Sequence, residues 1–235
     1  MRAVAARPKR YRDTLEWMLR HVEGKRVLYI GTVDDNPDNA RKHPPVHRGL
    51  ARRARSVLGA YRSEAQAASL RAEGLEAVGA DVETLNLGQT FEVIVAADTI
   101  EHLANAGRFL GALGRHLEAE GILLVSTPNP TSLVRILELL ARGRTKANVE
   151  HTCWYTAQVL DQLAARFGLR VVEETAIDEM HKYHRPGARQ RSPGAGKRLA
   201  TMLLVLVNRI GCGLFPQFSE TLGLVLARPR RSEGR

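Results

Sequence analysis

The chain has 235 residues and an apolar content of 44%, so it can bury a sizeable core as one α/β domain or two smaller ones. Its two cysteines exclude a disulfide framework and a four-cysteine zinc site. The net charge of +10 is compatible with an anionic partner. However, no aromatic residues alternate with the basic ones, so we do not expect a nucleic-acid partner.

The first part of the chain predicts a helix followed by a buried strand. Residues 1–10 are basic and no apolar run follows them, so we expect no secretory signal and a cytoplasmic location. Residues 11–22 place four apolar side chains on one helical face. The run 25–31 is apolar and ends in glycine, which is typical of a strand buried on both faces. We therefore expect an N-terminal helical segment over 1–24 and one domain over 25–235.

The segments that follow alternate between predicted helices and predicted strands. After a polar loop over 32–45, helices are expected over 47–55, 63–73, 106–117, 131–141 and 156–167, with Ser63 capping the second. Strands are expected over 56–61, 77–81, 91–98, 121–127, 169–176 and 221–227. Such alternation favours α/β architecture: a Rossmann-like, doubly wound and mostly parallel sheet.

An insertion over 178–215 interrupts this alternation before the last strand. Its first part is basic and rich in proline and glycine, and residues 199–215 are apolar. The apolar run is too short and too interrupted to cross a membrane. It could contact a membrane surface peripherally, form a homodimer contact, cover the substrate pocket, or simply pack on the sheet.

Three short segments in the central part of the chain form a recognisable set. They are DTIEHL at 98–103, STPNP at 126–130 and EHTCWY at 150–155, each placed after an expected strand or before an expected helix. In this order and spacing they resemble the class I S-adenosylmethionine-dependent methyltransferases. More narrowly, they resemble small methyltransferase-domain proteins with an EHL segment after strand four and STPNP ending strand five.

The resemblance implies a seven-stranded sheet whose antiparallel last strand is 221–227. It also implies S-adenosyl-L-methionine as cofactor, bound across the carboxyl ends of the first four strands. The residues that it assigns to the methionine part, the ribose, the adenine and the methyl side are, in that order, Gly31 and Thr32, Tyr61 and Arg62, Asp81 and Val82, and Ala97 and Asp98. Two positions depart from the family pattern: β-branched residues follow Gly31, and Tyr61 replaces an acid.

Methyl transfer to a hydroxyl benefits from a base, and His102 is the candidate because it follows strand four. It could instead pack the loop. The substrate-binding candidates are Asn129, His151, Trp154 and Tyr155, although the two aromatic residues could equally pack a helix onto the sheet. The spacing of His43, His47 and His102 matches no metal-ligand pattern, so we expect no metal.

These observations predict a methyltransferase that acts on a hydroxyl or amine of a small molecule, such as a secondary metabolite or a glycan precursor. The two departures leave open a catalytically silent, methyltransferase-like scaffold that works as a partner protein. The basic charge leaves open an RNA-modifying methyltransferase.

Overall fold

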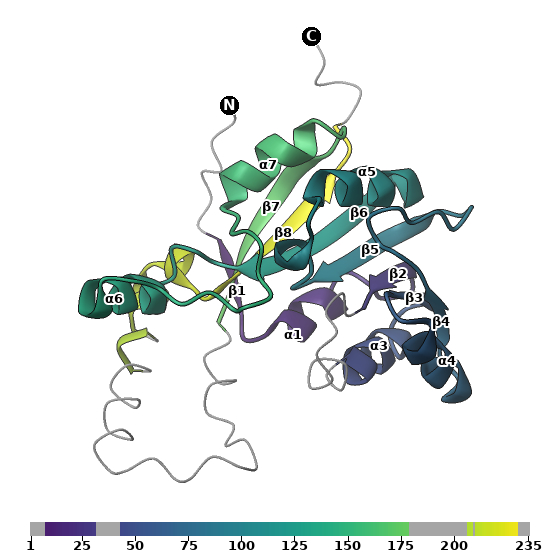
Figure 1. Cartoon of the computed structure of the whole chain (residues 1–235), viewed down its shortest axis with the longest axis horizontal. Helices are drawn as coiled ribbons and strands as arrows, with labels where there is room; N and C mark the ends of the chain where they lie inside the picture. The colour runs from purple at the N-terminus through teal and green to yellow at the C-terminus, as the bar shows by residue number, and fades with distance from the viewer. Residues whose placement is uncertain (1–7, 32–42, 179–205, 209, 230–235) are drawn as a thin grey trace.

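A computed structural model describes residues 8–31, 43–178, 206–208 and 210–229 (Figure 1). The described residues form one eight-stranded sheet. Its strands are, in spatial order, β1 (Lys9–Tyr11), β7 (Arg170–Ile177), β8 (Thr221–Ala227), β6 (Leu117–Pro128), β5 (Phe91–Ala97), β2 (Arg26–Ile30), β3 (Ser56–Tyr61) and β4 (Glu76–Gly79). Strand β8 runs antiparallel to both of its neighbours, whereas every other pairing is parallel.

The predicted Rossmann-like sheet with an antiparallel last strand is therefore confirmed. The eighth strand is β1, which lies inside the segment expected to be only helical. It pairs with the carboxyl half of β7, placing Lys9 opposite Thr175 and Tyr11 opposite Ile177. Because β1 is three residues long, polar and at an edge, it has no apolar alternation that a sequence pattern could reveal.

Helices cover both faces of the sheet (Figure 1). On one side lie α1 (Thr14–Leu19), α3 (His43–Ala51) and α4 (Glu64–Ala72); on the other lie α5 (Ala106–His116) and α7 (Ala157–Ala165). The side chains of Asp13, Ser63, Asn105 and Thr156 accept backbone N–H bonds at helix starts. The expected cap at Ser63 is among them, with Gln66 as the donor at 3.3 Å.

Helix α3 begins earlier than predicted. Residues 43–45 were expected to belong to a polar loop, yet they form its first turn. Two prolines, Pro44 and Pro45, suit this place because the first backbone N–H groups of a helix need no intrahelical partner. The rest of that expected loop, 32–42, lies outside the described residues and includes Thr32.

Strand β2 shows how the two apolar cores arise. Leu28 and Ile30 point to the side of α5 and α7, while Val27 and Tyr29 point to the side of α1 and α3. Both pairs are essentially inaccessible to solvent. This burial on both faces explains why the strand reads as a continuous apolar run.

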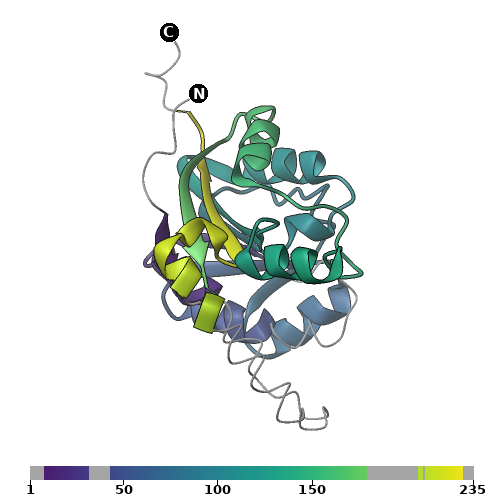
Figure 2. The same cartoon turned by 90° about the vertical axis from the view of Figure 1, so that its left-hand side faces the viewer.

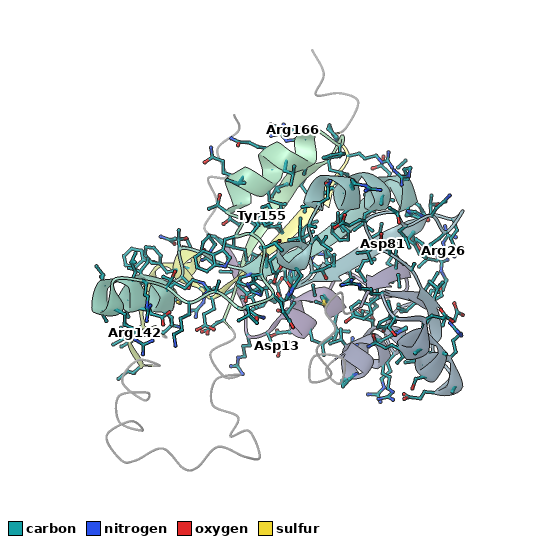
Figure 3. The ribbon with its side chains drawn as sticks, in the orientation of Figure 1. Asp13, Arg26, Asp81, Arg142, Tyr155 and Arg166 are labelled. Atoms are coloured by element: carbon teal, nitrogen blue, oxygen red, sulfur yellow. The ribbon has the colours of Figure 1, made fainter. Side chains whose placement is uncertain are left out.

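Helix α6 (Leu133–Arg142) extends away from the sheet and buries none of its side chains (Figures 1 and 3). Figure 2 shows the helical residues around 206–214 beside it. The contact is close, since a Cβ added to Gly211 would lie 2.5 Å from Cδ2 of Leu133. The start of the apolar run at 199–215 lies outside the described ranges. None of the described helices is long and apolar enough to cross a membrane.

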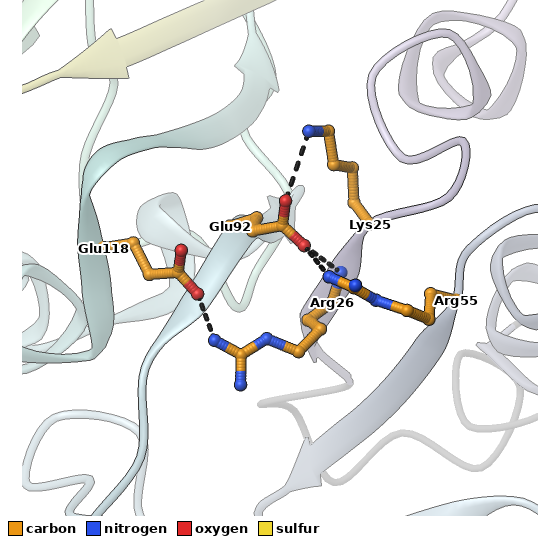
Figure 4. A network of polar contacts seen from close by, with 5 residues as sticks. All are labelled: Lys25, Arg26, Arg55, Glu92 and Glu118. Carbon is orange, nitrogen blue, oxygen red and sulfur yellow. Dashed lines mark hydrogen bonds and ion pairs between the residues drawn. The ribbon is translucent and has the colours of Figure 1, made fainter.

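A charged network lies near the amino ends of the central strands (Figure 4). Glu92 accepts the backbone N–H of Arg26 at 3.0 Å and the ammonium of Lys25 at 3.2 Å, and it pairs with Arg55. Arg26 also pairs with Glu118. These contacts tie β2, β5 and β6 together at the edge opposite the one where ligands bind in open parallel sheets.

Candidate functional site

The carboxyl ends of four neighbouring parallel strands form the candidate site. In the order β5, β2, β3 and β4, these strands end at Ala97, Ile30, Tyr61 and Gly79. The residues just after them are Asp98, Gly31, Arg62 and, two positions on, Asp81. The fold therefore brings the predicted cofactor-binding positions to one edge, where a ligand of a doubly wound sheet is expected.

Tyr61 does not present its hydroxyl at this edge. Its side chain is fully buried, and its oxygen lies 2.9 Å from Nδ1 of His47 in α3. The ring covers Gly31, where an added Cβ would lie only 2.1 Å from Cε1 of the tyrosine. The prediction that Tyr61 contacts a ribose is therefore corrected. Where the family pattern has an acid, this chain has a tyrosine whose hydroxyl is hydrogen-bonded inside the protein.

Exposed polar groups remain at the ends of β3 and β4. Arg62 and Asp81 are both exposed. The carboxylate of Asp81 accepts the N–H of Glu83 at 3.0 Å and the hydroxyl of Thr84 at 3.2 Å, which fixes a turn. The next residue, Val82, is buried and supplies apolar surface below this turn.

Asp98, the residue after β5, has an unusual conformation. Its φ is 46°, and it is the one non-glycine residue with positive φ in the described part of the chain. Its N–H lies 3.0 Å from the carbonyl of Ser126, and its carboxylate accepts the Ser126 hydroxyl at 2.9 Å. A left-handed aspartate costs roughly 1–2 kcal/mol, so bonds from β6 hold a strained turn at this edge.

The turn leads into η1 (Ile100–His102), which carries a buried acid. The side chain of Glu101 is inaccessible to solvent, and its Oε2 accepts the Thr127 hydroxyl at 3.0 Å. Its Oε1 has no hydrogen-bond partner among the described residues. Burial and then the nearby charge of Asp98 raise the pKa of Glu101 to about 8.

Two histidines from distant segments meet beside this acid. The rings of His102 and His151 contact each other edge to face with their centroids 4.7 Å apart. Thr152 fastens the second histidine, because its hydroxyl donates to the carbonyls of Glu101 and Leu103 at 3.0 and 2.7 Å. Burial, followed by His102 and Arg135, lowers the pKa of His151 to about 4, so this imidazole is neutral at physiological pH.

Of the remaining substrate-binding candidates, one is partly exposed and two are buried. Trp154 is partly exposed, and the guanidinium of Arg135 lies 5.1 Å from its ring centroid. Tyr155 is 7% exposed and belongs to the core on the α5 and α7 side. Asn129 is buried. Its Nδ2 donates to the carbonyls of Gln217 and Ser219, and its Oδ1 accepts the backbone N–H of Thr131. These contacts assign Asn129 a structural role in place of the predicted contact with substrate.

Glu101 was missed by reasoning from the sequence. One sequence signal pointed to it: Glu101 lies next to His102, in the segment that follows the strand predicted over 91–98. Burial of its side chain, however, depends on β6 and on the loop that carries Thr152, which are distant in sequence.

Comparisons with known proteins agree with this fold. The model of a family described as "methyltransferase domain" matches residues 4–174. A ubiquinone biosynthesis O-methyltransferase of Bartonella quintana is 27% identical over 95 residues, and the match spans 38% of each chain. Among solved structures, an S-adenosylmethionine-dependent methyltransferase from Archaeoglobus fulgidus has 16% identity and a TM-score of 0.54, with 92% of this chain and 91% of that chain covered. One from Mesorhizobium loti has 18% identity and a TM-score of 0.52, with 91% and 95% covered.

Proposed function

We propose that this chain, which belongs to the methyltransferase-domain family and is a class I S-adenosylmethionine-dependent methyltransferase, methylates a hydroxyl oxygen of a small-molecule acceptor. His102 is the proposed general base. The observation that carries the proposal is the position of His102 at the carboxyl edge of the sheet, beside the buried Glu101 and the neutral His151.

The residues at this edge suit the cofactor chemically. S-adenosylmethionine carries cationic, anionic and hydroxyl groups, and the residues that follow β3, β4 and β5 include two acids, Asp81 and Asp98, and the basic Arg62. When bound, the cofactor supplies an electrophilic methyl group. The residues proposed to hold it are Gly31, Thr32, Arg62, Asp81, Val82, Ala97 and Asp98.

A hydroxyl acceptor gives the base a task. The proton leaves the acceptor oxygen for the imidazole of His102 as the oxygen–methyl bond forms and the sulfur–methyl bond breaks. A neutral amine has a free lone pair and gains less from a base. The partly exposed ring of Trp154 provides a wall for an aromatic or sugar acceptor. The curated O-methyltransferase of Bartonella quintana supports an oxygen acceptor, although the chain spans only 38% of that relative's length.

Methyl transfer from labelled S-adenosylmethionine to paired acceptors tests the proposal. Each pair has the same ring or sugar and differs only in a hydroxyl or an amine. We expect methylation of hydroxyl members, and a fall in kcat of about 10²- to 10⁴-fold in His102→Gln. His21→Gln is the matched control, because His21 is also half-buried but lies in another part of the fold.

Two results would contradict the proposal. Methylation of the amine members alone, or an unchanged kcat in His102→Gln, would exclude His102 as the base for a hydroxyl. Cofactor binding without transfer to any acceptor would favour the scaffold function.

A further inference from the structure

We propose that Glu101, His102 and His151 form a binding site for a divalent transition-metal ion. One donor atom from each of the three residues lies within 4.8 Å of the other two. Metal–nitrogen and metal–oxygen bonds are about 2.0–2.2 Å long, so small rotations of the two imidazoles would close the group around an ion.

Each of the three side chains has a buried nitrogen or oxygen atom that makes no hydrogen bond to the described residues, and this indicates a ligand. Oε1 of Glu101 and Nδ1 of both His102 and His151 are buried, and none has a hydrogen-bond partner within the described ranges. The Glu101 side chain itself is fully buried. Burying a polar atom without a hydrogen-bond partner is unfavourable, and it is unusual in a native protein for each of three adjacent side chains to carry such an atom. An ion bound by the group would give a donor atom of each residue a partner.

Neighbouring residues hold this donor group in place. The hydroxyl of Thr127 in β6 donates to the other carboxylate oxygen of Glu101, which leaves Oε1 for a ligand. The hydroxyl of Thr152 holds the loop of His151 against η1, as does its backbone N–H, which lies 2.8 Å from the carbonyl of Glu101. Outer hydrogen bonds of this kind orient ligands in known metal sites and fix their geometry.

The donor set selects the class of ion. Two imidazole nitrogens and one carboxylate oxygen suit Zn²⁺, Mn²⁺, Co²⁺ or Fe²⁺, whereas Mg²⁺ and Ca²⁺ prefer oxygen ligands. Three protein ligands leave at least one coordination position open. A hydroxyl bound at that position loses its proton more readily, so the ion would take over the activation that His102 provides in its absence.

The sequence expectation of no metal considered only His43, His47 and His102. The proposed site uses just the last of these, together with its neighbour Glu101 and with His151 from a separate loop. No ligand spacing in the sequence connects these residues, because the fold brings the loop and η1 together.

Co²⁺ is the probe for the test, because its visible absorption reports the number and type of its ligands. The full-length protein, first stripped with a chelator, is titrated with Co²⁺ without cofactor or acceptor, and Zn²⁺ is then added as competitor. We expect one saturable band that Zn²⁺ abolishes and Mg²⁺ does not. Glu101→Gln and His151→Gln should each weaken Co²⁺ binding at least tenfold.

The control variant His21→Gln should bind Co²⁺ like the wild type. If Glu101→Gln fails to fold, His151→Gln still tests the site, because the His151 side chain is only half-buried and its replacement should leave the fold intact. Absence of a saturable band, or a band of unchanged affinity in both site variants, would overturn the site. Because methyl transfer is not measured, failure here leaves the proposed function untouched, and failure of methyl transfer does not affect this result.

Discussion

The hydroxyl oxygen of Tyr61 lies 2.9 Å from Nδ1 of His47, and both side chains are fully buried on the α1 and α3 side of the sheet. Burial lowers the pKa of His47 and raises that of Tyr61, so both groups are neutral. Gly31 and Gly59 give the two rings room, since a Cβ on either would lie within 3 Å of the tyrosine ring. This neutral pair occupies the place where the family pattern has an acid.

Tyr61→Phe tests whether the pair is structural. The change leaves Nδ1 of His47 buried without its partner, so we expect a loss of about 1–3 kcal/mol in the free energy of unfolding. Urea denaturation measures it. Affinity for S-adenosylhomocysteine should stay within twofold of the wild type. A folded variant that loses affinity at least tenfold would return the hydroxyl to the ribose-binding role.

Gly31→Ala tests the close contact at the end of β2. The added methyl group would overlap the Tyr61 ring, so we expect destabilisation of about 1–3 kcal/mol by thermal or urea denaturation. Gly49→Ala is the matched control. There the Cβ would meet Cδ1 of Leu15 at 3.5 Å, an ordinary contact inside α3. Equal stability of Gly31→Ala and wild type would show that the ring does not press on Gly31.

The elements that the sequence predicts are those with a clear pattern of apolar and polar residues. Strands β3 and β8 were predicted with their observed ends, because each is an apolar run bounded by polar or turn residues. Strand β1 carries no such signal. A helix was predicted over 131–141 and is observed as α6, but none of its side chains is fully buried. Periodicity thus predicts an element without predicting what covers it.

The candidate site could be predicted only in part. The strand ends place Gly31, Asp81 and Asp98 at one edge, and parallel pairing makes this a necessary consequence of strand order. The inward orientation of Tyr61 depends on the space that Gly31 leaves for its ring and on a histidine from α3. The hydrogen bonds of Asn129 depend on residues near η3 (Pro216–Phe218), which come much later in the chain. Such tertiary contacts have no local signature.

Glu92→Gln tests the network at the opposite edge of the sheet. The Arg26 backbone N–H, then Lys25, lower the pKa of Glu92 from 4.5 to about 2, with Arg55 contributing less. A carboxyl whose pKa is lowered by folding stabilises the folded state at pH values above its pKa in the unfolded state. This stabilisation is lost as the pH falls from 4.5 towards 2. Wild type should therefore be the more stable protein at pH 7, and the difference should shrink between pH 4.5 and 2.

Urea denaturation of both proteins across this pH range measures the difference. Glu120→Gln is the control, because Glu120 is exposed on the same strand as Glu118 but outside the network of Figure 4. A stability difference that is independent of pH would show that the charge of Glu92 contributes nothing.

Methyl transfer requires a cofactor site at the carboxyl edge of β5, β2, β3 and β4. Titration calorimetry of the folded 235-residue protein with S-adenosylhomocysteine measures directly whether that site exists. We expect saturable heat with one site per chain, weakened at least tenfold in Asp81→Asn, because the family resemblance places this carboxylate at the adenine. No heat at millimolar ligand, in a sample whose circular dichroism shows an intact fold, would contradict the account and favour a scaffold that has lost its cofactor.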